Sequence, residues 1–143
     1  MVKHKINTEL SRSVYKKNKN AIHPKDCYRN IFRLLPSYQA KFAKGEWKIA
    51  YGYVSSMPGI FCRHCFILCD SGVIDPTVYS VEKYVSKDND SREYYITKVF
   101  SDIKTYIDAV IANDLYPGLS GYLFKEDVEA VMWAHKHNLV FVG

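Results

Sequence analysis

Apolar residues at helical spacing organise the first predicted element of the chain. The run CYRNIFRLL, residues 27–35, repeats apolar residues every three or four positions, while Arg29 and Arg33 fall on another face. Asp26, a residue type favoured at helix N-caps, precedes this run and places Cys27 at the first helical position. The pattern therefore predicts a helix that begins at Cys27 and has one apolar face.

The pattern then changes to that of β-strands. Trp47–Val54 and Ile60–Cys69 are rich in β-branched and aromatic residues, and a short turn separates them. A tight turn leads to a third strand at Val73–Asp75, and residues 78–85 are expected to continue the sheet before a polar loop at residues 86–92. These runs predict an antiparallel sheet directly after the first helix.

Helical spacing returns in the last third of the chain. We expect Ser101 to cap a helix with one apolar stripe, made of Ile103, Tyr106, Ile107, Val110 and Ile111. Residues 125–137 predict a further helix, and Leu139–Val142 reads as a short terminal strand. Four residues of this last helix share one side: Val128, Val131, Met132 and His135.

Together these elements predict a single α+β domain that spans all 143 residues. Residues 1–22 form a basic, poorly periodic lead-in with a helix expected around Glu9–Lys17, and residues 23–85 form a core made of the first helix and the sheet. Residues 93–143 form a helical C-terminal part that ends in the short strand. We expect the first helix to pack on the antiparallel sheet and the C-terminal helices to cover it.

Composition narrows the class of protein. With 48% hydrophobic and 24% charged residues, the chain has the composition of a folded globular protein. No stretch approaches the roughly 20 apolar residues of a membrane span. The first residues are basic and lack the apolar segment of a signal peptide, so we expect a protein of the reducing cytoplasm without membrane contact.

The positive charge is concentrated at the start of the chain. Residues 1–33 carry nine Lys and Arg against Glu9 and Asp26, whereas the whole chain has a net charge of +5. Such a basic arm can contact nucleic acid or an acidic protein, although it is more often a solvated segment. No sequence pattern of a nucleic-acid-binding fold accompanies it, so a binding module with a basic N-terminal arm is the alternative function.

Three of the four cysteines lie close together in the second strand. Strand alternation places Cys62 and Cys65 on opposite faces, which makes a disulfide between them geometrically poor. Their C-x-x-C spacing could serve zinc, but His135 and His137 are the only other close pair and point to different sides of a helix. We therefore interpret these residues and Cys69 as small apolar side chains of a buried strand, and expect no metal or cofactor.

Cys27, His64 and Asp75 are the candidate catalytic residues. A thiol is a useful nucleophile only as thiolate, which a helix N-terminus and a neighbouring imidazole both favour. A carboxylate can then fix the tautomer and orientation of the imidazole. Alternatives remain for each residue: a small apolar side chain at Cys27, Arg63 as the functional polar group beside His64, and an ordinary turn residue at Asp75.

The spacing of His64 and Asp75 leaves their pairing open. Direct pairing would require a hairpin centred between Cys69 and Asp70, whereas the turn residues are centred one or two positions later. A bulge at Gly72 would absorb the difference. Without a bulge, Asp75 lies diagonal to His64 or on the other face.

The motifs CYRNIFRLLP, WKIAYGYV and RHCFILCDSGVIDPT occur in this order and resemble the transglutaminase-like branch of the papain-like superfamily. The resemblance covers about residues 24–79, with Phe66 where that branch usually has tryptophan. It implies a papain-like fold in which the helix of the nucleophile packs on an antiparallel sheet. It also implies that Cys27 is the nucleophile, His64 the general base and acid, and Asp75 the residue that orients the imidazole.

The resemblance predicts thiol chemistry but does not select a reaction. The superfamily includes proteases, amidases, deamidases, glycanases and acyltransferases, and a fold alone does not choose among them. We expect a cysteine-dependent hydrolase or acyltransferase that attacks an amide-type bond, with a protein or peptide as the substrate. An inactive member of the same fold that serves in binding is a further alternative.

Overall fold

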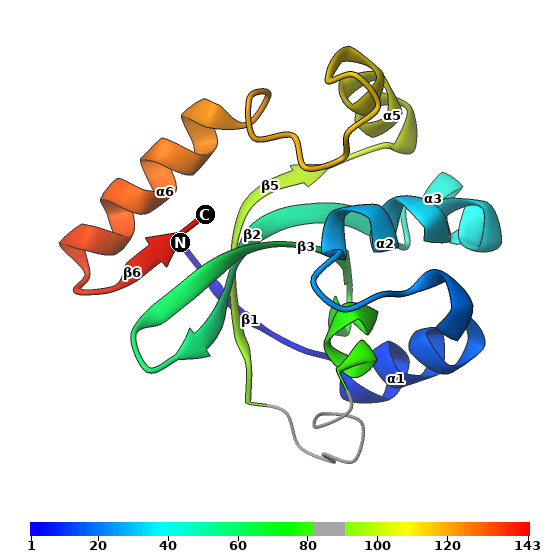
Figure 1. Ribbon diagram of the computed structural model, residues 1–143, viewed down its shortest axis with the longest axis horizontal. Coiled ribbons are helices and arrows are strands. Elements are labelled where there is room, and N and C mark those ends of the chain that lie inside the picture. The colour runs from blue at the N-terminus through cyan, green and yellow to red at the C-terminus, as the bar shows by residue number, and fades with distance from the viewer. Residues whose placement is uncertain (82–90) are drawn as a thin grey trace.

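A curled, mostly antiparallel sheet forms the centre of the computed structural model, which describes residues 1–81 and 91–143 (Figure 1). The strand order is β1 (Lys3–Lys5), β5 (Glu93–Phe100), β2 (Lys48–Met57), β3 (Ile60–Cys69) and β4 (Gly72–Ile74). A last strand, β6 (Val140–Val142), pairs in parallel with the beginning of β3. The sheet that the sequence predicts at β2, β3 and β4 is therefore confirmed.

The two ends of this strand order approach each other. Ile6, just after β1, forms a parallel bridge with Val73 of β4, and the backbone N–H of Asn7 donates to the Val73 carbonyl at 2.7 Å. The sheet is thus nearly closed, which leaves few unpaired backbone groups along its edges. Its inner face encloses apolar side chains that include Phe66 and Tyr94.

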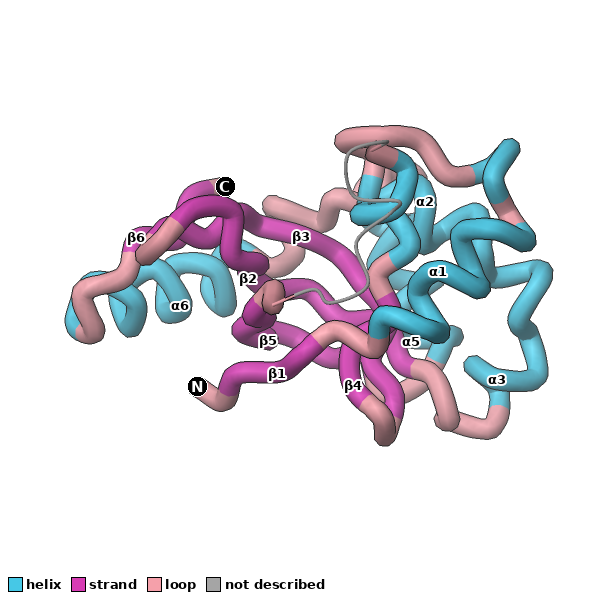
Figure 2. The backbone as a smooth tube through the Cα atoms, turned by 90° about the horizontal axis from the view of Figure 1, so that it is seen from below, coloured by secondary structure: helices cyan, strands magenta, loops and turns pink. Residues whose placement is uncertain are grey.

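Helices lie on both sides of the sheet. They are α1 (Thr8–Lys17), α2 (Cys27–Leu34), α3 (Gln39–Ala43), α5 (Ile103–Ala112) and α6 (Phe124–Lys136). Figures 1 and 2 show α1, α2 and α3 together on one side, and α6 with β6 on the opposite side. None of the helices in the described ranges has the length and apolar character that a bilayer-spanning helix needs.

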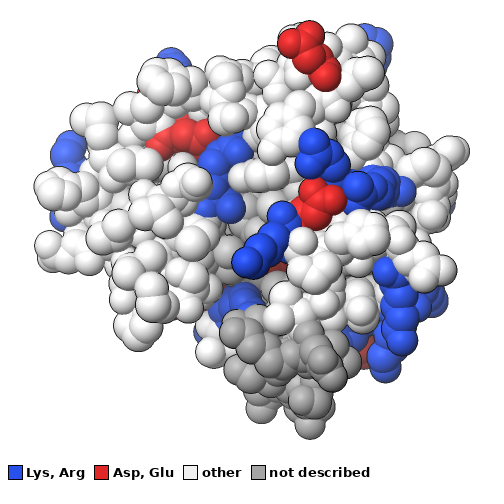
Figure 3. Space-filling model, viewed as in Figure 1, with Lys and Arg blue, Asp and Glu red and all other residues white. Residues whose placement is uncertain are grey.

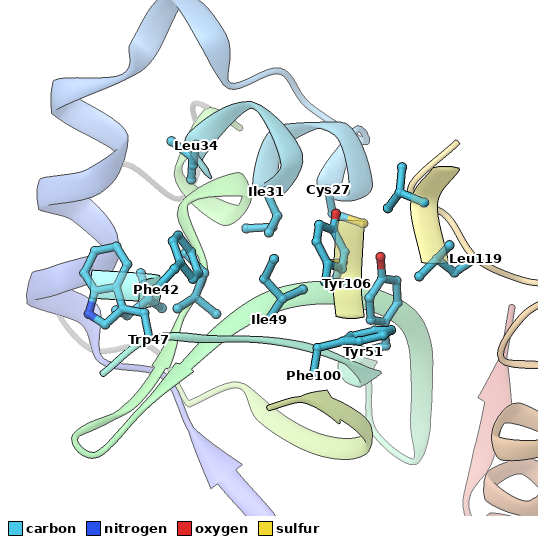
Figure 4. Packing of buried hydrophobic residues seen from close by; sticks show 14 of the residues in the cluster. Cys27, Ile31, Leu34, Phe42, Trp47, Ile49, Tyr51, Phe100, Tyr106 and Leu119 are labelled. Carbon is cyan, nitrogen blue, oxygen red and sulfur yellow. The ribbon is translucent and has the colours of Figure 1, made fainter. Parts of the chain in front are cut away.

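The apolar face of α2 forms the centre of the largest core cluster. Ile31 and Leu34 are fully buried in the same cluster as Ile49 and Tyr51 of β2, and Figure 4 shows Ile31 pointing toward Ile49. Burial of each such aliphatic side chain stabilises the fold by about 1.5–3 kcal/mol. The helical spacing that begins at Cys27 is therefore the spacing of the buried face, and the predicted helix is confirmed.

Three parts of the predicted organisation are wrong. The helix expected around Glu9–Lys17 is present as α1, but residues 1–22 also contain β1, and Val14 of α1 is buried in the core, so they are not a poorly periodic lead-in. Residues 93–100 do not belong to a helical part but form β5, which pairs with both β1 and β2. Residues 76–80 form a 3-10 turn rather than a strand, and most of the expected continuation and polar loop, residues 82–90, lies outside the described residues.

The helix α6 packs through a different side from the one that its apolar residues suggest. Ala130 and Ala134 are buried against β2, β5 and β6, whereas Val128, Val131 and Met132 are 39%, 42% and 57% exposed. Small alanine side chains allow the helix backbone to lie close to the aromatic residues of the strands. The larger apolar side chains are consequently left on the surface.

Candidate active site

Cys27 is the first residue of α2, as the sequence predicts. Asp26 occupies the N-cap position, but its carboxylate makes no capping hydrogen bond. It forms ion pairs instead with Arg33 at 3.0 Å and Arg29 at 3.4 Å. The expectation of a side-chain cap is therefore wrong, and this carboxylate does not occupy the backbone N–H groups of the first turn. Those groups and the helix dipole favour an anion at this end of α2.

The start of α2 lies beside a break in the pairing of β3. On this edge β6 pairs with residues 60–62 of β3 and β4 pairs with residues 67–69. Between them, α2 approaches β3 through two contacts. Arg63 Nη1 donates to the Tyr28 hydroxyl at 3.0 Å, and Cys27 lies near enough to the His64 ring to raise its pKa. The nucleophile and the base proposed from the sequence therefore lie side by side.

Asp75 completes the group from the other side of the imidazole. His64 Nε2 lies 2.8 Å from Asp75 Oδ2, and the Asp75 side chain is fully buried. Because Nε2 bonds to the carboxylate, Nδ1 is the ring nitrogen left for the thiol of Cys27. The structure thus brings together all three residues that the sequence selected, in the order thiol, imidazole, carboxylate.

The register of the β3–β4 hairpin explains how Asp75 reaches His64. Cys69 pairs with Gly72 and Ile67 with Ile74, so the hairpin turns through two residues without a bulge. Extended by one position, this register places Asp75 opposite Phe66. Asp75 is therefore the diagonal neighbour of His64 on the same face, a separation that longer side chains bridge.

The surroundings of His64 favour its protonated form. Burial lowers the pKa of the imidazole, but the negative charge of Asp75, its hydrogen bond to the ring and the neighbouring Cys27 raise it. The net effect is a His64 pKa well above its usual value of 6.5. A protonated imidazole next to a thiol is the arrangement that stabilises thiolate and supplies a proton to a leaving group.

Two residues that the sequence analysis missed hold Asp75 in place. The Tyr94 hydroxyl, from β5, donates to Asp75 Oδ2 at 2.7 Å, the same oxygen that His64 contacts. The Ser11 hydroxyl, from α1, accepts the Asp75 backbone N–H at 2.9 Å. Both residues are fully buried, and nothing in the local sequence around Asp75 points to either of them.

Asn30 is a third missed residue, and here the sequence carried a usable sign. Its amide is fully buried, donates to Thr77 Oγ1 at 3.0 Å and to the His23 carbonyl at 2.8 Å, and accepts the His23 backbone N–H. These bonds tie α2 to the turn that follows Asp75. Asn30 lies three residues after Cys27, on the apolar face of the helix, where a polar residue requires a partner.

The remaining cysteines differ from Cys27 in their surroundings. Cys65 is fully buried, as expected, and burial raises the pKa of its thiol well above the usual value. Cys62 and Cys69 are only partly buried, which corrects the expectation, and lie near Ser56 and Ser71. Across residues 1–81 and 91–143, no group of His, Cys, Asp and Glu side chains is arranged to hold a metal ion.

Arg63, the alternative polar candidate beside His64, has a different role in the structure. Its Nε pairs with Asp127 Oδ2 at 2.9 Å, and its Nη1 also donates to the Gly118 carbonyl at 2.8 Å. Only 8% of the side chain is exposed. Arg63 therefore links β3 to α6 and to the loop before it.

Comparison of the chain with models of protein families, with curated proteins and with solved structures found no match. The resemblance to the transglutaminase-like branch stays a prediction carried by the sequence motifs. The geometry of Cys27, His64 and Asp75 stands independently of it. A helix-borne thiol, a strand-borne imidazole and a buried carboxylate are the groups that covalent attack on a carbonyl carbon requires.

Proposed function

We propose that the protein is a cysteine-dependent hydrolase or acyltransferase that acts on an amide-type bond of a protein or peptide. The observation that carries this proposal is the position of His64, which is hydrogen-bonded to Asp75 on one side and has Cys27 near enough to raise the pKa of its ring. A papain-like or transglutaminase-like fold is part of the proposal. It is supported by α2 and its thiol packing on the antiparallel sheet that carries the histidine.

In the first half of the reaction, the thiolate of Cys27 attacks the amide carbonyl carbon. The carbonyl π electrons move to oxygen, and the uncapped N–H groups at the start of α2 are placed to stabilise that oxyanion. The C–N bond then breaks as the His64 imidazolium donates its proton to the leaving amine. The products are a thioester on Cys27, a free amine and a neutral imidazole.

In the second half, water or a second amine attacks the thioester carbonyl. Neutral His64 accepts a proton from the attacking group, and Asp75 stabilises the imidazolium that forms again. Collapse of the intermediate breaks the C–S bond and restores the thiolate–imidazolium pair. Water as the attacking group gives hydrolysis, and an amine gives acyl transfer. A reducing compartment such as the cytoplasm would keep the nucleophile available.

Alkylation by iodoacetamide, mapped to each cysteine by mass spectrometry, tests this function without a known substrate. Exposure alone predicts that Cys62 and Cys69 react first, because Cys27 is only 8% exposed. The proposed thiolate predicts the opposite order, with Cys27 alkylated fastest. His64→Ala should slow alkylation of Cys27 and leave the rates at Cys62 and Cys69 unchanged.

The proposal would be overturned if Cys62 and Cys69, the more exposed cysteines, were alkylated faster than Cys27. The alternative binding module would then gain support, together with an inactive member of the fold. At present the structure favours the enzyme, because the basic N-terminal segment is not a free arm. Its β1 pairs with β5, and Ser11 of α1 supports Asp75 directly.

A further inference from the structure

We propose that the pocket between α2 and α6 binds a large, uncharged apolar side chain of the substrate, next to the bond that Cys27 attacks. The pocket has a volume of about 520 Å³, within the range of roughly 300–1,000 Å³ that is typical of ligand sites. Its lining includes Tyr28, Tyr53, Arg63, Tyr116, Val128 and Met132. This inference rests on the proposed function and names the substrate class that the same site accepts.

The pocket begins next to Cys27 along α2, although Cys27, His64 and Asp75 are not among its lining residues. Tyr28, which forms one wall, directly follows Cys27 in α2. Arg63, on the opposite face of β3 from His64, and its cross-strand partner Tyr53 also line the pocket. A substrate whose carbonyl carbon lies at Cys27 would therefore place a neighbouring side chain in this pocket.

The charged groups of the pocket are already neutralised by one another. Arg63 pairs with Asp127 and lies over the rings of Tyr28 and Tyr51, at 5.4 and 5.6 Å from their centroids. The second carboxylate oxygen of Asp127 accepts the Tyr53 hydroxyl at 3.3 Å. Arg63 Nη2 has no hydrogen-bond partner in the described part of the chain, but it is shielded from solvent. Arg63 and Asp127, the charged side chains among the described lining residues, therefore compensate each other rather than a charged substrate group.

The open wall of the pocket is apolar. Phe124, Val128, Val131 and Met132 lie along α6 and line the pocket, and each is between 39% and 68% exposed. Figure 3 shows that Lys and Arg gather mainly over the side of α1 and α2, whereas the surface over α6 and β6 is largely uncharged. Covering such a wall gains about 25 cal/mol per Å² of apolar area, and a flexible methionine adapts to side chains of different shape.

Three chloroacetamide probes with different N-substituents test the inference: phenethyl, methyl and aminoethyl. We expect the phenethyl probe to alkylate Cys27 at least about tenfold faster than the methyl probe, which corresponds to about 1.4 kcal/mol, and the cationic probe to gain no advantage. Met132→Asp and, as a second variant, Val128→Asp should bring the phenethyl-to-methyl ratio close to one. Met57→Asp is the matched control, because Met57 is equally exposed at 59% but lies outside the pocket.

The rate at which iodoacetamide alkylates Cys27 distinguishes failure of the pocket proposal from failure of the proposed function. If Cys27 reacts rapidly with iodoacetamide but shows no preference for the phenethyl probe, the pocket proposal is wrong and the proposed function stands. The same conclusion follows if the preference persists in both Asp variants. If Cys27 is unreactive toward iodoacetamide, the proposed function fails, and the pocket proposal fails with it.

Discussion

The centre of the site and the pocket beside it are built in opposite ways. Around Asp75, polar side chains from α1, β3 and β5 are buried and hydrogen-bonded to one residue. Along α6, apolar side chains such as Val131 and Met132 are left in water. Buried polar networks fix one geometry, because any displacement leaves an unpaired group in a low dielectric. The apolar wall has no such constraint, so the groups around Asp75 are held in one geometry, whereas the side chains along α6 can adapt.

The largest effect should come from removing the base. His64→Ala should lower turnover of an amide substrate by about 10²–10⁴-fold, because proton transfer to and from the reacting groups is lost. Steady-state kinetics would measure the loss once a substrate is known. His135→Ala on the exposed surface of α6 is the matched control and should leave turnover unchanged. Equal activity in wild type and His64→Ala would remove His64 from the mechanism.

Asp75→Asn should change the pH dependence of stability. Because the pKa of His64 is raised in the folded protein, protonation of His64 stabilises the fold fully below about pH 6.5. This contribution is lost as the pH rises through the higher folded-state pKa. The variant loses the carboxylate charge, so its free energy of unfolding should vary less over this window, as urea unfolding at several pH values would measure. A titration of the His64 ring followed by NMR should show a lower midpoint in the variant; an unchanged midpoint would contradict the assignment.

Tyr94→Phe should have a smaller effect than Asp75→Asn. The variant loses one hydrogen bond to a buried carboxylate, which stabilises a fold by about 1.5–3 kcal/mol, but keeps the contact between His64 and Asp75. Turnover should therefore fall less than in Asp75→Asn. Tyr95→Phe, on the opposite face of the same strand, provides the control for turnover. If turnover fell more in Tyr95→Phe than in Tyr94→Phe, the integrity of the strand as a whole, and not the hydroxyl of Tyr94, would determine activity.

The smallest effect should be found on the open wall of the pocket. Met132→Ser should change the free energy of unfolding by no more than about 0.5 kcal/mol, because the side chain is 57% exposed. Ala130→Leu on the buried side of α6 should instead cost about 1–3 kcal/mol through overpacking. Urea unfolding of both variants would test the comparison. A marked decrease in the free energy of unfolding of Met132→Ser would mean that this wall is part of the core.

The parts of the fold that the sequence predicts are those with strong local periodicity. The spacing at Cys27, Ile31 and Leu34 gave the buried face of α2, and the β-branched and aromatic runs gave β2 and β3. The strand β5 also has such a composition, EYYITKVF, and could have been predicted. The strand β1 could not, because Lys-His-Lys becomes a strand only through its pairing with β5.

The residues of the candidate site can be grouped in the same way, into those that local sequence predicts and those that it does not. Cys27, His64 and Asp75 were found because each occupies a distinctive position in its own element. Ser11 and Tyr94 were not found, because they meet Asp75 only after distant segments have folded together. The sequence also predicts the wrong buried side for α6. Periodicity identifies an apolar face, but it does not show whether the rest of the protein or a ligand covers that face.

The contacts of Asp75 with Ser11 and Tyr94 also bear on when the protein can begin to work. All three proposed reacting residues lie within the first 75 positions, but Tyr94 is synthesised only when about two thirds of the chain has been made. A chain still growing on the ribosome carries the thiol and the imidazole before the strand that secures their carboxylate partner exists. Non-local pairing of this kind forms late in folding. On the proposed function, a nascent or proteolytically shortened chain that lacks β5 should therefore be inactive.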